Sequence, residues 1–113
     1  MASLGRFLHP EIVQQEFPNA VVPRGITRDL AALAMARVKG AQVITGQRFD
    51  ILRTVAEGHR VALELDWSGT LQVQYGSLSP GTVMRAHVAA FYDLRDGRIV
   101  ALRSYDCYEP WAP

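Results

Sequence analysis

The sequence predicts a single α+β domain, in which an antiparallel sheet carries helical cover on one face. Two patterns lead to this fold class. In the second half of the chain, four segments alternate apolar and polar residues with period two, and short turn-like connectors join them. Ahead of these segments lies one stretch whose apolar residues recur at helical spacing. Long strands joined by short turns form an antiparallel meander, and a preceding helix can cover one of its faces.

The bulk composition is that of one ordinary globular domain spanning residues 1–113. Hydrophobic residues make up 49% and charged residues 20%, so a packed core is expected. The net charge is +1 and the arginines are scattered among acids, unlike the basic, aromatic-rich face of nucleic-acid binders. No apolar run approaches membrane-spanning length. We therefore expect neither nucleic acid nor membrane as a partner, and the single cysteine, Cys107, is consistent with a cytoplasmic location.

The first half of the chain is expected to hold a strand, a loop and the helix. The strand covers Glu11–Phe17 and the loop covers 19–25. Thr27 is a suitable N-cap for the helix, Asp29 falls in its first turn, and Gly40 is in position to end it.

The second half is expected to hold four strands, and tight hairpin signals stand at Glu57-Gly58 and Asp96-Gly97. The expected strands cover Gln47–Val55, Arg60–Val73, Val83–Leu94 and Arg98–Tyr108.

Period two then assigns side chains to the two faces of the sheet, unless a β-bulge shifts the alternation. The more apolar set is expected to face the helix, and this turns Asp106 to the same side as several aromatic residues. The opposite, outer face mixes charged and apolar residues, namely Glu64, Asp66, Arg85, Phe91, Ile99 and Arg103. A half-apolar outer face favours association of two sheets, so a homodimer through it is expected.

Asp106 is the first candidate for chemistry. A carboxyl group on the helix-facing side, beside Ser104 and Tyr108, loses solvation of its charged form and becomes a usable acid or base near neutral pH. The alternative is a structural role, in which Asp106 accepts backbone N–H hydrogen bonds at the strand end.

His87 is the second candidate, because imidazole titrates near neutrality. Simple alternation puts it on the outer face next to Glu64 or Asp66, where its role would be structural. One bulge between His87 and the Asp96-Gly97 turn would instead bring it into the pocket, facing Asp106.

Trp67, Tyr92 and Tyr108 are expected to line a pocket for a small apolar molecule, because aromatic walls suit flat ligands. Plain core packing is the alternative for these three residues. No metal site is expected, because the histidines are far apart in the sequence. No cofactor is expected either, because the chain has neither a phosphate-binding loop nor a dinucleotide fingerprint.

Several short motifs, in their order and spacing, resemble a known family. Leu8-His9-Pro10-Glu11 stands near the start, Asp96-Gly97-Arg98-Ile99 lies between the last two expected strands, and Tyr105-Asp106-Cys107-Tyr108-Glu109-Pro110-Trp111 follows them. From about Leu8 to Trp111 the chain is similar to SnoaL-like domains, which are polyketide-cyclase-like and ketosteroid-isomerase-like members of the nuclear-transport-factor-2-like superfamily. The resemblance implies a curved sheet and helices that form a cone-shaped pocket. It implies no single chemistry, because members include isomerases, cyclases, dehydratases and epoxide hydrolases, and also proteins that only bind or dimerise.

The chain departs from this family in two respects. The family's long first helix is expected to be missing, because only Ala2–His9 precedes the first strand; either the start is truncated or a second subunit supplies that wall. The family's catalytic residues also do not carry over, since the isomerase acids match Phe17 and Ala90, and the epoxide-hydrolase residues match Leu65, Trp67 and Ser104. The pocket is therefore expected to be lined by Phe17, Leu65, Trp67, Tyr92, Ser104 and Tyr108, with Asp106 and His87 as the candidate catalytic residues.

Two functions stay open at this point. The first is a cofactor-free isomerase, cyclase or hydrolase that applies acid–base chemistry to a small apolar carbonyl compound. The second is a non-catalytic module of the same fold that binds a ligand or dimerises, and the loss of the family's acids favours it.

Overall fold

A computed structural model describes residues 2–110 of the chain, with side chains from residue 5 onwards. It confirms the α+β class. The elements are α1 (Ala2–Phe7), β1 (Leu8–Glu16), β2 (Ile26–Arg28), α2 (Leu30–Val43), β3 (Ile44–Glu57), β4 (Arg60–Leu71), β5 (Val83–Arg95) and β6 (Arg98–Tyr108). Trp111, part of one quoted motif, lies outside the described residues. Within residues 2–110, no helix is both long and apolar enough to cross a membrane.

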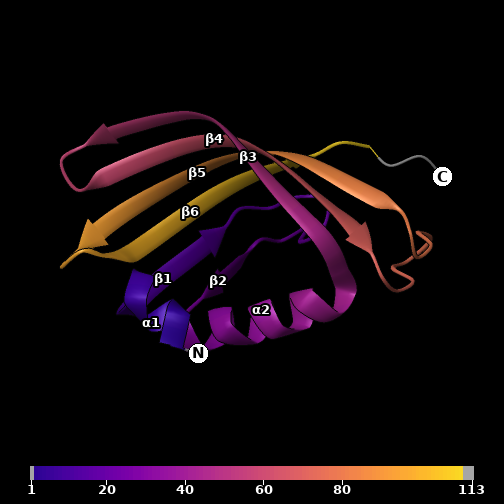
Figure 1. Ribbon diagram of the computed structural model, residues 1–113, viewed down its shortest axis with the longest axis horizontal. Helices are drawn as coiled ribbons and strands as arrows, with labels where there is room; N and C mark the ends of the chain where they lie inside the picture. The colour runs from indigo at the N-terminus through magenta and orange to yellow at the C-terminus, as the bar shows by residue number, and fades with distance from the viewer. Residues whose placement is uncertain (1, 111–113) are drawn as a thin grey trace.

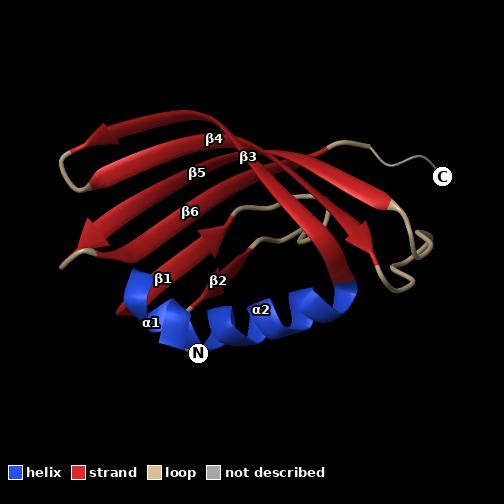
Figure 2. Ribbon diagram, viewed as in Figure 1, coloured by secondary structure: helices blue, strands red, loops and turns tan. Residues whose placement is uncertain are grey.

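The strands form one curved, open sheet in the order β2-β1-β6-β5-β4-β3, which arches over α2 (Figures 1 and 2). β3 to β6 are the antiparallel meander that the sequence predicts. β1, however, pairs parallel with β6, so the sheet is mixed and the expectation of a wholly antiparallel sheet needs this correction. The reason is the connection: α2 carries the chain from the β2 edge to the opposite β3 edge, and the meander then returns until β6 lies beside β1.

Both ends of α2 differ from the predicted ones. The N-cap is Asp29, whose side chain accepts a hydrogen bond from the Ala32 N–H at 2.9 Å. Thr27, the expected cap, belongs to β2 and pairs with Gln15. Gly40 does not end the helix. Its φ is not positive, as that of a helix-ending glycine usually is, and α2 continues past it to Val43 and then directly into β3.

The meander itself follows the predicted alternation. β4 and β5 pair without interruption from Arg60/Asp93 to Thr70/Val83. In the turn that joins β5 to β6, Asp96 has φ 54° and Gly97 has φ 74°. Two consecutive residues with positive φ are typical of the hairpin turn that Asp-Gly predicts. Alternate residues of each strand therefore face either α2, on the concave side of the sheet, or away from it, on the convex side.

The hydrophobic core lies towards one end of the sheet, where α2 runs into β3. Leu71, Leu78 and Met84 are buried there, with Trp67 and Tyr108 packed against them. No described residue of α2 is fully buried. The helix thus covers the concave side without filling the space beneath it, and this space is the site described next.

Candidate functional site

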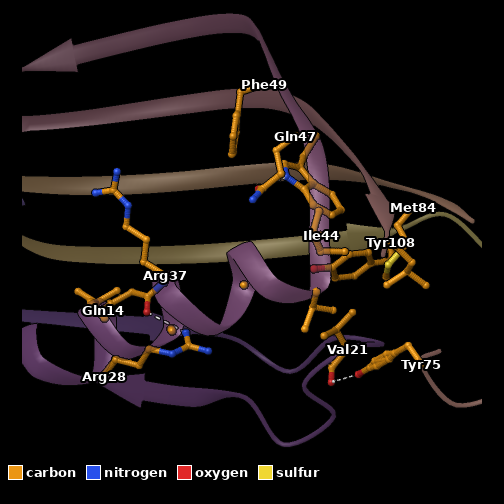
Figure 3. A pocket seen from close by; sticks show the side chains of 16 residues that line it. Gln14, Val21, Arg28, Arg37, Ile44, Gln47, Phe49, Tyr75, Met84 and Tyr108 are labelled. Carbon is orange, nitrogen blue, oxygen red and sulfur yellow. Dashed lines mark hydrogen bonds between the residues drawn. The ribbon is translucent and has the colours of Figure 1, made fainter. Parts of the chain in front are cut away.

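Two adjoining cavities occupy the concave side of the sheet. The larger, about 610 Å³, lies between α2 and the sheet, and the smaller, about 330 Å³, lies over β4, β5 and β6. Four side chains line both, those of Gln47, Phe49, Trp67 and Tyr108. Figure 3 displays the larger cavity and labels Gln47, Phe49 and Tyr108 among the side chains that line it. Sizes between about 300 and 1,000 Å³ and a mostly apolar lining are typical of small-molecule sites.

Asp106 lies in the smaller cavity next to a second carboxylate. It sits on the concave face of β6, and Ser104 and Tyr108 point to the same side. Glu16, the last residue of β1, is in register with Ser104 and lines the same cavity. The parallel pairing of β1 with β6 therefore brings two carboxyl groups from distant parts of the sequence to one wall.

The two carboxyl groups have different surroundings. Burial raises the pKa of Asp106, and the negative charge of Glu16 raises it further; a hydrogen bond from Ser104 and the charge of Arg28 act in the opposite direction. Glu16 is held by an ion pair with Arg28 at 3.0 Å and a hydrogen bond from Asn19 Nδ2 at 2.9 Å. Burial and the neighbouring negative charge therefore both favour the protonated form of Asp106.

Aromatic side chains form the wall on either side of this carboxyl group. Burial, followed by the charges of Asp106 and Glu16, raises the pKa of Tyr108, so its phenol stays protonated at neutral pH. Trp67 packs edge-on against Tyr108 with ring centroids 6.1 Å apart, and its Nε1–H donates to Gln47 Oε1 at 2.9 Å. This wall is therefore fixed by ring packing and by a hydrogen bond.

His87 lies on the convex face and does not meet Asp106. Its Nδ1 is 2.8 Å from Asp66 Oδ1, and its Nε2 is 3.0 Å from Glu109 Oε2. Two carboxylates stabilise the imidazolium form, and the hydrogen bond with Asp66 is the largest cause of its raised pKa. A bulge does occur between His87 and the turn, at Asp93/Leu94, but the residues from His87 to Asp93 keep their alternation, so His87 stays outside the cavity.

Phe17 also lies away from the cavity, contrary to the expectation from the family match. It follows Glu16 and points to the convex face, where its ring stacks on Tyr105 with centroids 4.4 Å apart. The other expected lining residues surround the smaller cavity, namely Leu65, Trp67, Tyr92, Ser104 and Tyr108.

Two functional candidates were missed by the sequence reasoning, Glu16 and Arg37. Alternation along β1 could have found Glu16, because Gln14 and Glu16 share one face while Val13, Gln15 and Phe17 share the other. Arg37 lies on the face of α2 that lines the larger cavity. Among the residues that the structure describes, no group of three or more His, Cys, Asp or Glu side chains could hold a metal ion.

Comparison with known proteins identifies the family of this chain and finds its fold in other proteins. The family model described as "SnoaL-like domain" matches residues 1–102. The chain belongs to the SnoaL-like family. No curated protein matches it in sequence.

Solved structures of several other proteins have the same fold. IdmH from Streptomyces antibioticus, described as a candidate polyketide cyclase, superposes with a TM-score of 0.73 at 22% identity, over 93% of this chain and 78% of IdmH. AclR from Streptomyces galilaeus, described as a candidate hydroxylase, gives a TM-score of 0.72 at 18% identity over 91% of this chain. A protein with a ketosteroid-isomerase-like fold from Catenulispora acidiphila gives 0.71 at 16% identity, over 91% of this chain and 72% of that protein. The chain spans only 64% of the length of AclR.

Proposed function

We propose that this SnoaL-like protein is a cofactor-free enzyme that moves a proton on a small apolar carbonyl compound, as an isomerase, cyclase or hydrolase. One observation carries the proposal: the Asp106 carboxyl group faces an aromatic-walled cavity in which burial and Glu16 raise its pKa. A raised pKa brings a carboxyl group closer to the operating pH, where acid–base catalysis is most effective. Two of the solved relatives carry names of cyclase or isomerase type, which is consistent with such chemistry.

The chemistry that this geometry supports is enolisation. The Asp106 carboxylate takes a proton from the carbon beside the carbonyl group; the C–H electron pair moves to form the C=C bond, and the carbonyl π pair moves to oxygen. The phenol of Tyr108, which is protonated at neutral pH, can donate a hydrogen bond to the resulting enolate oxygen. Where a second C=C bond is conjugated with the enolate, return of the proton from Asp106 to the far carbon of that dienolate gives an isomer. Attack of the enolate carbon on a second carbonyl group gives a ring, and the new alkoxide then takes the proton from Asp106.

A substrate-independent assay can test this step. In deuterium oxide, proton NMR follows exchange of the acidic C–H groups of β-tetralone, an apolar bicyclic ketone. We expect the protein to accelerate the exchange and Asp106→Asn to remove about 10²–10⁴-fold of that acceleration, the usual contribution of a general base. Asp66→Asn is the matched control, because Asp66 lies on the convex face of the sheet and pairs with His87.

Two results would contradict the proposal. One is exchange at the buffer rate with the unmodified protein over a range of ketones that demonstrably bind it. The other is an Asp106→Asn variant as fast as the unmodified protein. Binding without exchange would favour the second candidate function, a ligand-binding module. The apolar residues Phe17 and Ala90, at the positions of the isomerase acids, also favour that function.

We also propose that two copies associate through the convex face of the sheet. Phe91 and Tyr105 are 39% and 43% exposed there, although their rings pack together with centroids 5.8 Å apart. Leu52 and Val55 of β3 add exposed apolar surface. An exposed apolar patch on a soluble domain is typical of an interaction surface. A cytoplasmic location stays the expectation from the single cysteine.

Light scattering at high micromolar concentration tests the association. We expect a dimer for the unmodified protein and a monomer for Tyr105→Glu, because a carboxylate buried in the interface has no partner. Ser77→Glu adds the same charge on an exposed loop and should leave the dimer intact. A monomeric unmodified protein, or a dimeric Tyr105→Glu variant with native circular dichroism, would argue against this interface.

A further inference from the structure

Arg37 is a solvent-exposed cationic side chain of α2 that lines the larger cavity. Leu33, Ala36, Arg37 and Gly40 all line that cavity, and their spacing of three and four residues puts them on one face of the helix. Ala36 and Gly40 are small, so they leave space around the guanidinium group. In Figure 3 the Arg37 side chain extends from α2 towards the strands of the sheet.

The other arginine of this cavity, Arg28, differs from Arg37 in having its charge neutralised. Arg28 pairs with Glu16 at 3.0 Å and also donates to Gln14 Oε1 at 2.9 Å. Arg37 has neither an ion pair nor a side-chain hydrogen bond with any residue that the structure describes. No described Asp or Glu lines the larger cavity, so the charge of Arg37 is uncompensated there.

Apolar surface continues from Arg37 towards Asp106. Phe49 and Trp67 line both cavities, so one ligand can extend along them from the larger cavity to the smaller one. A guanidinium group binds carboxylates and sulfonates with charge-assisted hydrogen bonds, and these are stronger where water is partly excluded.

We propose that Arg37 binds the anionic group of an elongated apolar ligand, whose body lies along Phe49 and Trp67 and whose far end reaches Asp106. The substrate class is then an apolar, largely aromatic or polycyclic carbonyl compound that also carries an acidic group. This inference deepens the proposed function and rests on it for what happens at Asp106, but the anion-binding part stands on the cavity alone.

A pair of fluorescent probes tests the charge recognition directly. Anilinonaphthalene sulfonate is anionic, and N-phenylnaphthylamine is the same aromatic body without the sulfonate. We expect Arg37→Gln to weaken sulfonate binding about tenfold, the effect of losing one charge-assisted hydrogen bond at a partly exposed site. Binding of the neutral probe should not change, and the difference between the variants should shrink at high salt because exposed charges are screened.

Three further variants complete the experiment. Lys39→Gln removes an exposed cation of the same helix that does not line either cavity, and should leave both probes unaffected. Ala36→Phe places a bulky side chain in the cavity beside Arg37 and should abolish binding of both. Asp106→Asn reports on the proposed function alone, because we expect it to lose ketone exchange.

The outcomes separate this inference from the proposed function. Equal sulfonate affinity of Arg37→Gln and the unmodified protein, or equal losses for both probes, would overturn the role of Arg37. Sulfonate binding that survives Ala36→Phe would locate the probe outside the cavity and overturn it as well. Neither result touches the exchange assay on Asp106→Asn, and failure of that assay would leave a selective sulfonate effect of Arg37→Gln intact.

Discussion

Replacing Gly69 by alanine should destabilise the fold, because the added methyl group would come too close to side chains that line the ligand cavity. Gly69 has an ordinary strand backbone, so the substitution carries no conformational penalty of its own. A Cβ at this position would lie 2.5 Å from Ile44 Cγ2 and 2.8 Å from Trp67 Cζ2. Both atoms belong to the packing where α2, β3 and β4 meet, so at least one of the two side chains must shift.

The expected loss follows from overpacking. One extra methyl group in a packed region costs about 1–3 kcal/mol when its neighbours must shift. For a chain of 113 residues, each kcal/mol lowers the melting temperature by about 4 °C, so we expect a decrease of roughly 4–12 °C. The indole of Trp67 is the group with open space beside it, because it lines both cavities. Its displacement into that space should also weaken binding of N-phenylnaphthylamine.

Thermal unfolding followed by circular dichroism measures the first effect, and probe titration measures the second. Gly40→Ala is the matched control, because Gly40 lies inside α2 and an added Cβ meets nothing within 4 Å. There the substitution should stabilise the protein by about 0.5–1 kcal/mol, the usual advantage of alanine over glycine in a helix. A Gly69→Ala variant that melts at or above the temperature of the unmodified protein would mean that Trp67 and Ile44 are not fixed as described.

Three other predictions concern single side chains. Because burial and Glu16 raise the folded-state pKa of Asp106 above its ordinary 3.8, the carboxyl group stabilises the fold fully below pH 3.8 and loses that contribution as the pH rises through the folded-state pKa. In urea titrations, Asp106→Asn should therefore gain stability relative to the unmodified protein as the pH rises through this range, and a constant difference would contradict the assigned surroundings. The NMR titration midpoint of His87 should lie above 6.5 and should fall in Asp66→Asn, because the hydrogen bond with Asp66 is the largest cause of the raised pKa. The stabilisation of the fold by protonated His87 is complete below pH 6.5 and disappears as the pH rises through the folded-state pKa. Leu71→Ala should cost about 2–5 kcal/mol in chemical unfolding, because Leu71 is only 2% exposed in the core cluster, and a loss well under 1 kcal/mol would mean that this core is loosely packed.

The meander was predictable because its determinants are local. Alternation fixes which side chains share a face, and Asp96-Gly97 supplies the positive φ angles of the hairpin turn. The same alternation correctly turned Asp106, Tyr108 and Trp67 to one side. The prediction for Phe17 was wrong, because that position was assigned by its match to the family and not by alternation along its own strand, where Val13 and Phe17 face outwards.

The predicted boundaries of the helix were wrong for a different reason. Thr27 and Asp29 are both good N-cap residues, and only the pairing of Thr27 with Gln15 assigns the first of them to a strand. Gly40 can end a helix or continue one, and here the direct entry of α2 into β3 decides that it continues. Local preference alone does not choose between such alternatives.

The sequence by itself determined the α+β class, the antiparallel meander and the orientation of Asp106, because each depends on spacing between residues close together in the chain. Only the tertiary structure decided that β1 runs parallel to β6, that Glu16 shares a cavity with Asp106, and that Arg37 lines the adjoining cavity from the helix. These are contacts between segments far apart in sequence, and they depend on the sheet order that α2 sets when it crosses from one edge to the other. The raised pKa of Asp106 and the uncompensated charge of Arg37 arise from those contacts, so the chemistry of the site follows from tertiary packing.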